Sequence, residues 1–163
     1  MDASEKTLLR KFPLFTGLTP DELAVAEEHM FESRYEPGER LFEEGDDGGY
    51  VCFILDGALE VLKQNSNGEE VSLAEMHMGQ SIGEMSLIDD MKRSATVRSV
   101  GQTRVQILTQ KGFRLLMRQH PRIAAIMLEH FTKMLSATVR ATSQELADTL
   151  AVTAEHTQLN FRA

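Results

Sequence analysis

The spacing of hydrophobic residues changes twice along the chain. In the first 30 residues the spacing is helical, with one apolar turn that Pro13 interrupts. Thr19 and Glu22 then have the spacing of a capping box, with Pro20 at the first helical position. We therefore expect a second helix that runs to about Met30.

From residue 31 to about residue 110 the pattern is typical of short strands. Runs such as YVCFIL, ALEVLK and ATVRSV alternate with turns such as EGDDGG and NSNGEE. Strands of roughly four to seven residues in this order predict an antiparallel β-roll or jelly-roll barrel. The segment ILDGAL places Asp-Gly between two apolar runs and predicts the clearest hairpin.

Helical spacing returns after residue 110. A short amphipathic stretch is followed by Pro121, which suits the first turn of a long helix that we expect to continue to about Glu155. The sequence thus predicts an α+β fold in one domain over residues 1–163. Its expected parts are an N-terminal helical segment (1–30), a β-roll (31–110), two C-terminal helices of which the last is long (111–155), and a tail (156–163).

Composition narrows the classes of protein to consider. The formal charge of −8 argues against non-specific binding to nucleic acid. Cys52 is the only cysteine and lies in an apolar run, so we expect a buried, inert thiol and no disulfide. No apolar run has the length of a membrane span, and the first residues lack the apolar core of a secretory signal. A cytoplasmic protein without membrane contact is the expectation.

Two opposite charges in SIGEMSLIDDMKRSATV, residues 81–97, suggest a binding site. A short helix that opens at Gly83 would present free N–H groups to an anion, and glycine lets the backbone approach closely. Arg93 can donate two parallel hydrogen bonds to phosphate oxygens, and the Ser94 hydroxyl stands beside it. Glu84 is only an acceptor when ionised, so it suits a sugar hydroxyl and would repel a phosphate. One ligand that carries both groups would use both charges.

An ordinary surface loop is the alternative interpretation of the same residues. Glu84 would then stabilise the first turn of the short helix. Arg93 would form a surface ion pair with Asp89 or Asp90.

The order of elements resembles the cyclic nucleotide-binding domain family, which includes the sensor domains of the catabolite activator protein and of protein kinase A regulatory subunits. YEPGERLFEEGDDGGYVCFILDGALEVLK resembles the first strands of that family, and GEMSLIDDMKRSATV, within residues 82–97, resembles its phosphate-binding cassette. The sequence departs from the family at Lys92, where a proline often precedes the arginine. The resemblance implies ligand contacts from seven residues of the cassette: Gly83, Glu84, Met85, Ser86, Arg93, Ser94 and Ala95.

The resemblance also implies where the base of the nucleotide would lie. Leu73 and Met76 fall on the strand that packs against the purine in the family. The long helix would cover the base, and either Thr138 or Thr142, four residues apart on one face, would reach its edge.

We therefore predict a sensor that binds cAMP and that repositions its long C-terminal helix to signal. cGMP is the alternative ligand, because Ser94 suits either base. That helix allows a homodimer, although its apolar spacing weakens after Leu135. The effector protein is unknown. Two alternatives are a degenerate domain without nucleotide that serves as a protein-interaction module, and the N-terminal sensor fragment of a larger regulator.

Other functions have little support in the sequence. After Thr142 the only basic residue is Arg162, so this chain is not expected to bind nucleic acid directly. No metal site and no catalytic cluster can be assembled, because the histidines are scattered. They are His29, His77, His120, His130 and His156. The protein is not expected to be an enzyme.

Overall fold

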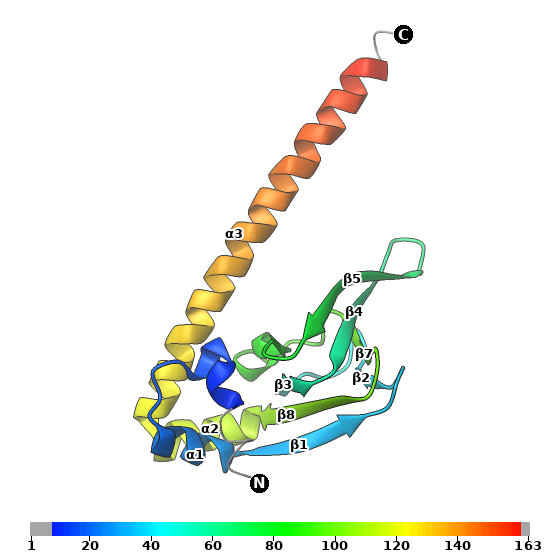
Figure 1. The fold of residues 1–163 in the computed structure, drawn as a ribbon. Coiled ribbons are helices and arrows are strands. Elements are labelled where there is room, and N and C mark those ends of the chain that lie inside the picture. Colours follow the sequence, from blue (N-terminus) through cyan, green and yellow to red (C-terminus); the bar gives the residue numbers. More distant parts are fainter. Residues whose placement is uncertain (1–7, 161–163) are drawn as a thin grey trace.

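A two-layered β-roll with helices packed at one end forms the body of the molecule, and one long helix projects away from it (Figure 1). The structure is a computed structural model that describes residues 8–160, with side chains described over residues 8–151. Part of the tail expected at 156–163 lies outside the described residues.

From residue 8 onwards, three short helices precede the first strand: the 3-10 turns η1 (Leu9–Lys11) and η2 (Pro13–Phe15), and the helix α1 (Pro20–Glu27). The expected capping box is confirmed, because the Glu22 N–H donates to the Thr19 hydroxyl and the Thr19 N–H donates to the Glu22 carboxylate. The helix was expected to run to about Met30, and this is wrong, since α1 ends at Glu27. Met30 instead pairs with Leu108 and begins a strand. The backbone from Met30 to Tyr35 pairs with β8 (Thr103–Thr109) and therefore cannot continue the helix.

The described residues contain eight strands in two antiparallel sheets. The strands are β1 (Met30–Tyr35), β2 (Arg40–Phe42), β3 (Tyr50–Asp56), β4 (Ala58–Gln64), β5 (Glu70–His77), β6 (Ser81–Ile82), β7 (Thr96–Ser99) and β8 (Thr103–Thr109). One sheet has the order β1-β8-β3-β6 and the other β2-β7-β4-β5. The predicted antiparallel β-roll is confirmed.

The continuous apolar run of β3 is explained by burial on both of its faces. Because side chains alternate along a strand, Val51 and Phe53 face the helical layer, whereas Cys52 and Ile54 face the other sheet. All four side chains are fully buried. Burial raises the pKa of the Cys52 thiol to about 12, as expected for an inert structural cysteine.

The Asp-Gly turn after β3 does not form the hairpin predicted for it. β3 lies between β8 and β6, whereas β4 lies between β7 and β5 in the other sheet. Gly57 carries the chain from one sheet to the other with φ of +84°, and a Cβ there would lie 2.5 Å from the Gln102 carbonyl oxygen. The hairpin of this region joins β4 to β5 instead.

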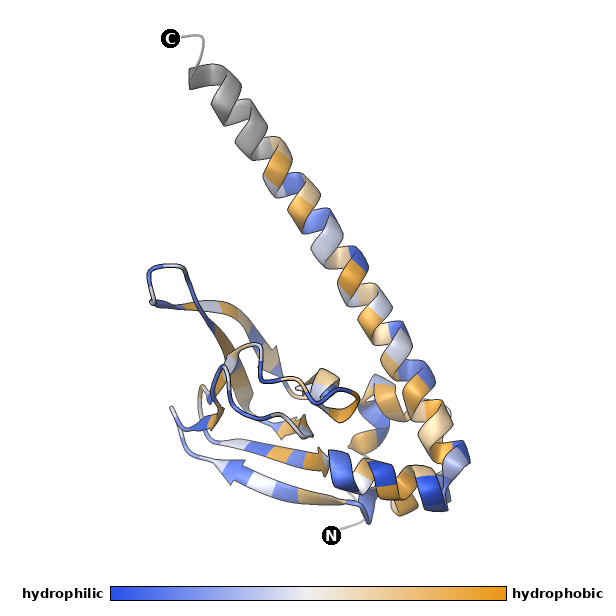
Figure 2. Cartoon of the chain, turned by 180° about the vertical axis from the view of Figure 1, so that it is seen from behind, coloured by the Kyte–Doolittle hydropathy of each residue, from blue (hydrophilic) through white to orange (hydrophobic). Residues whose placement is uncertain are grey.

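Two helices follow the β-roll, α2 (Gln110–Gln119) and α3 (Pro121–Asn160). The start of α3 at Pro121 agrees with the sequence, but the helix continues past the end expected near Glu155. Its first turns bury apolar side chains such as Met127 and Phe131 against the body, while the later turns stand clear of the β-roll (Figures 1 and 2). Within the described part of the chain, no helix is long and apolar enough to span a membrane.

We expect Phe53→Ala to destabilise the protein by about 3–5 kcal/mol, because truncating a buried aromatic side chain leaves a cavity. The Phe53 ring lies 5.4 Å from the Phe12 ring and 5.0 Å from the Phe15 ring, centroid to centroid, so it joins the N-terminal turns to the β-roll. Urea unfolding measures the loss. Phe31→Ala, at a half-exposed position on β1, is the control and should change stability by less than about 1 kcal/mol. Equal losses in the two variants would contradict this description of the core.

Candidate functional site

The segment between β6 and β7 forms a short helix and a loop around one buried arginine. The helix expected to open at Gly83 is present as the 3-10 turn η3 (Glu84–Leu87). Gly83 has φ of +84°, a left-handed conformation that favours glycine. A Cβ at this position would also collide with Nη1 of Arg93. The glycine therefore permits both the turn and the close approach of the guanidinium.

Arg93 lies inside the protein, with only 4% of its surface exposed. Its Nη1 donates to the Ser86 hydroxyl at 3.1 Å, and its Nη2 donates to the Tyr50 carbonyl oxygen at 2.9 Å. The guanidinium carbon lies 3.8 Å from the centroid of the Phe42 ring and 4.3 Å from that of the Tyr50 ring. The two rings therefore attract and orient the cation through their π faces.

This buried cation has no carboxylate partner among the described residues. Its Nε is also buried and makes no hydrogen bond there. The alternative of a surface ion pair with Asp89 or Asp90 is wrong, because Arg93 is buried and its guanidinium donates to Ser86 and Tyr50 instead. Asp90 contacts Arg114 at 3.6 Å and accepts from Gln110. A buried, uncompensated guanidinium is costly, and an anion at this position would reduce the cost.

Glu84 is the acidic group of the site. Its Oε1 accepts a hydrogen bond from the Ser81 hydroxyl at 2.8 Å. Burial raises the pKa of the Glu84 carboxyl above its ordinary value, and the Ser81 hydrogen bond opposes that effect. The ionised carboxylate is thus poorly solvated, and a further hydroxyl donor would stabilise it.

A cavity of about 200 Å³ connects these groups. Its lining residues are Phe42, Val61, Ile82, Gly83, Glu84, Met85, Ser86, Asp89, Met91, Lys92, Arg93, Ser94, Ala95 and Val97. All seven cassette residues named from the sequence are among them. The structure therefore brings the guanidinium and the carboxylate to one hollow, as a ligand with an anionic and a hydroxyl end requires.

The four residues named for the base do not line this cavity. Leu73 is 62% exposed on β5, and Met76 packs against the apolar core between the two sheets. Thr138 and Thr142 are exposed on α3. Their contacts with a ligand stay predictions.

Sequence reasoning missed the two aromatic residues that hold Arg93. Phe42 is the last residue of β2 and Tyr50 the first of β3, so the two flank the glycine-rich loop between these strands. The only signal was an aromatic residue on each side of EGDDGG. That pattern does not indicate which charged side chain the two rings would contact.

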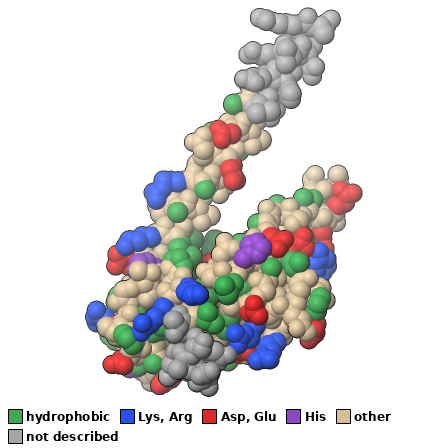
Figure 3. Space-filling view, viewed as in Figure 1, with side chains coloured by type: hydrophobic (Ala, Val, Ile, Leu, Met, Phe, Trp, Pro, Cys, Tyr) green, Lys and Arg blue, Asp and Glu red, His purple; other side chains and the backbone are tan. Residues whose placement is uncertain are grey.

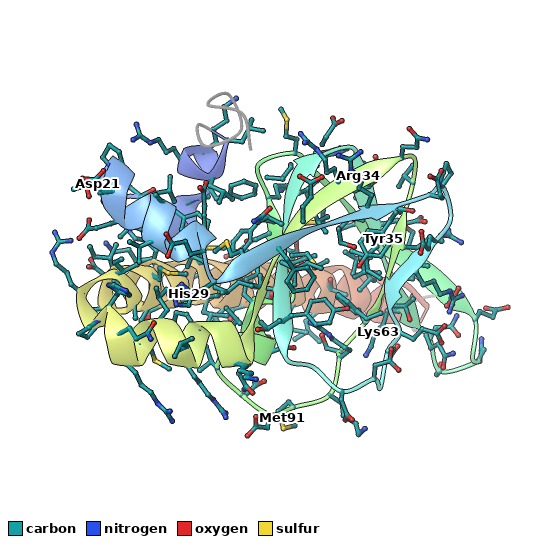
Figure 4. All side chains as sticks on the ribbon, turned by 90° about the horizontal axis from the view of Figure 1, so that it is seen from below. Asp21, His29, Arg34, Tyr35, Lys63 and Met91 are labelled. Atoms are coloured by element: carbon teal, nitrogen blue, oxygen red, sulfur yellow. The ribbon has the colours of Figure 1, made fainter. Side chains whose placement is uncertain are left out.

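Other hollows and clusters offer less chemistry. A more open hollow of about 350 Å³ lies beside Arg34, Tyr35 and Thr103, two of which Figure 4 labels. Arg34 is exposed and already bonded to Glu32 at 3.0 Å. No three His, Cys, Asp or Glu side chains are grouped as metal ligands in the described part of the chain.

Comparison with known sequences agrees with this geometry. Residues 32–120 match the family described as the cyclic nucleotide-binding domain. The chain is 32% identical over 112 residues to the cyclic AMP receptor protein of Thermus thermophilus, an alignment that covers 69% of this chain and 52% of the relative. It is 31% identical over 112 residues to a cAMP-dependent protein kinase regulatory subunit of Blastocladiella emersonii, covering 69% of this chain and 28% of that protein. The chain thus spans about half the length of the first relative and less of the second.

Solved structures share the fold. The catabolite activator protein of Thermus thermophilus superposes with a TM-score of 0.76 at 29% identity, covering 85% of this chain and 63% of that one. The regulatory domain of Toxoplasma gondii PKA, crystallised with cAMP, gives a TM-score of 0.64 at 28% identity, covering 71% of this chain and 45% of that one.

We expect Glu84→Gln to stabilise the ligand-free protein at neutral pH. Because the pKa of Glu84 is raised in the folded state, its favourable contribution is complete below the ordinary value of 4.5 and is lost as the pH rises through the raised pKa. Glutamine has no such dependence. Urea unfolding of both proteins at about pH 4.5 and about pH 7.5 measures the difference, which should favour the variant more at the higher pH.

The control for this comparison is Glu145→Gln on the exposed face of α3, which should show no such trend with pH. A stability difference for Glu84→Gln that stays constant between the two pH values would contradict the assigned cost of ionisation.

Proposed function

The chain belongs to the cyclic nucleotide-binding domain family, and on this premise we propose that it is a sensor module that binds cAMP between Arg93 and Glu84. Binding would bias the position of α3 and so signal to a partner. Residues 1–163 would form one such module, whose role is regulation rather than catalysis.

The buried guanidinium of Arg93 is the observation that carries this proposal. It lines the cavity, its buried Nε–H has no acceptor, and it has no carboxylate partner among the described residues. The cyclic phosphate carries one negative charge and two exocyclic oxygens, so it would supply both the missing charge and the missing acceptor. The aromatic rings of Phe42 and Tyr50 hold the guanidinium in place before the ligand arrives.

The other cassette residues would divide the remaining ligand contacts. The Glu84 carboxylate would accept a hydrogen bond from the ribose 2′-hydroxyl, and this bond would stabilise its buried negative charge. The backbone N–H of Ala95 and the hydroxyl of Ser94 would donate to the phosphate. Met85 and Ser86, both in η3, would form one wall of the site, and Ser86 already accepts a hydrogen bond from Arg93.

The size of the cavity supports a lid over the base. At about 200 Å³ it is smaller than the roughly 300 Å³ or more of typical small-molecule pockets. The phosphate and ribose would fill it, and the base would project towards β5 and α3. Leu73 and Met76 would then support one face of the base, while Thr138 or Thr142 would approach its edge.

Movement of α3 follows from this arrangement. The later turns of α3 stand clear of the β-roll (Figure 3). A base that contacts both β5 and α3 would favour a position of the helix nearer the β-roll. The ligand shifts this equilibrium only by its difference in affinity for the two arrangements.

We expect cAMP to raise the melting temperature of nucleotide-free protein. At 100 times the dissociation constant, binding adds about 2.7 kcal/mol, which is roughly 5–10 °C for a domain of this size. Parallel titrations with cAMP and cGMP in a thermal-shift assay measure the effect and the base preference. Arg93→Leu should abolish the shift, and it should leave the ligand-free protein stable because it removes a buried charge.

Arg34→Leu is the matched control, since Arg34 is exposed, paired with Glu32 at 3.0 Å and outside the cavity. It should retain most of the shift. Equal shifts in the wild type and in Arg93→Leu would overturn the phosphate role of Arg93. No shift with either nucleotide would leave a family member that binds another ligand or none.

We also propose that α3 forms a homodimer. Beyond the turns packed on the body, the large exposed apolar residues of α3 lie in one sector about 60° wide: Leu135, Val139, Leu146 and Leu150. The sector continues the face that buries Phe131 against the body. An apolar stripe of this kind on a helix clear of its own domain suits a second copy of the same stripe.

Leu146→Glu is expected to shift the protein from dimer to monomer, because it places a charge in the middle of the apolar stripe. Analytical ultracentrifugation at several protein concentrations measures the distribution. The control Ala137→Glu introduces the same charge on the opposite, exposed face and should leave the dimer intact. A monomeric wild type would refute the dimer without affecting the nucleotide site.

A further inference from the structure

Lys63 makes a contact behind the cassette that the ligand site itself does not use. It lies near the end of β4, and Figure 4 shows it at the end of the molecule away from Asp21. Its Nζ donates to the Ser94 carbonyl oxygen at 2.6 Å and to the Glu44 carboxylate at 2.5 Å. Ser94 and Ala95 line the cavity, whereas Lys63 does not. The ammonium group therefore contacts the cassette from outside the cavity.

The geometry of the peptide bond gives this contact a consequence. The Ser94 carbonyl and the Ala95 N–H belong to the same planar trans peptide group, so they point in opposite directions. Fixing the carbonyl on Lys63 therefore turns the N–H of Ala95 away from Lys63. No described residue accepts a hydrogen bond from that N–H. The donor is thus oriented and unused.

Glu44 fixes the position of the lysine. Its carboxylate also accepts from the Gln64 N–H at 3.2 Å, and its own N–H donates to the Thr96 hydroxyl at 2.9 Å. The Lys63 ammonium holds the pKa of the Glu44 carboxyl below its ordinary value, so the pair stays ionised near neutral pH. The loop after β2, the end of β4 and the start of β7 are thereby connected at one point.

We propose that Lys63, held by Glu44, is a positioning residue for phosphate binding: it orients the Ser94–Ala95 peptide so that the Ala95 N–H donates to one exocyclic oxygen of the cyclic phosphate. This inference rests on the proposed function. The positive charge of Lys63 also polarises the peptide group, which makes its N–H a stronger donor. Lys63 itself touches no ligand atom, so its effect is confined to the geometry and strength of that donor.

The test compares the wild type with Lys63→Met, which keeps the length of the side chain and removes the donor. The ligands are cAMP and its two phosphorothioate diastereomers, each with sulfur in place of one exocyclic oxygen. We expect Lys63→Met to weaken cAMP about fivefold, the scale of one modest hydrogen bond. The ratio of affinities for the two diastereomers should also move towards one, because the donor that distinguishes the two oxygens is no longer fixed.

Two further variants separate positioning from general stability. Lys63→Arg keeps a cationic donor and should restore most of the affinity and the ratio. Arg98→Met removes a comparable half-exposed ion pair in the same sheet, the one with Glu60 at 2.5 Å, and should change neither. The proposal is overturned if Lys63→Met binds all three ligands with wild-type affinity. It is also overturned if the variant loses affinity for all three while the ratio of affinities for the two diastereomers stays the same.

A measurement without ligand distinguishes failure of this inference from failure of the proposed function. If the wild type binds none of the three ligands, the proposed function fails. The amide resonance of Ala95 in ligand-free protein then still reports its orientation by NMR. Lys63→Met should shift that resonance and Lys63→Arg should not, whereas an unchanged resonance in Lys63→Met would overturn the positioning role.

Discussion

The Arg93 guanidinium contacts two aromatic rings, one hydroxyl and one carbonyl, and it forms no ion pair with a carboxylate of the described residues. Moving such a cation out of water costs on the order of several kcal/mol, so the surrounding structure must stabilise it. Gly83 leaves room for it, and Phe42 and Tyr50 attract it from their ring faces. The site is thus built around an unpaired positive charge, which a bound anion would balance.

The rigidity that this arrangement needs comes from the β-roll. β3 is buried on both faces, and its first residue, Tyr50, supplies both a ring and a carbonyl to Arg93. The backbone of Arg93 is fixed as well, because its N–H donates to the Asp46 carbonyl and its carbonyl accepts from Gly45. The arginine is therefore attached to the loop after β2 and to the central strand at the same time. Small movements of the cassette must work against both.

The sequence was informative where local chemistry decides the outcome. The capping box at Thr19, the start of α3 at Pro121 and the strand rhythm follow from short-range rules and agree with the structure. The Asp-Gly turn failed as a hairpin prediction because local pattern does not specify which sheet receives the next strand. The contact of Arg93 with Tyr50 and the Lys63–Glu44 pair were also missed, since they join residues that lie 43 and 19 positions apart. No spacing rule connects such residues before the fold is known.

The length of α3 has a mechanical consequence. Only its first turns are packed against the body, up to about Phe131, and the chain then continues as one uninterrupted helix to Asn160. At 1.5 Å per residue that free portion is a lever of about 45 Å. A rotation of about 10° at the packed end would carry the far end through roughly 8 Å. A displacement at the ligand site too small to disturb the core would thus be delivered to a distant surface as a large one.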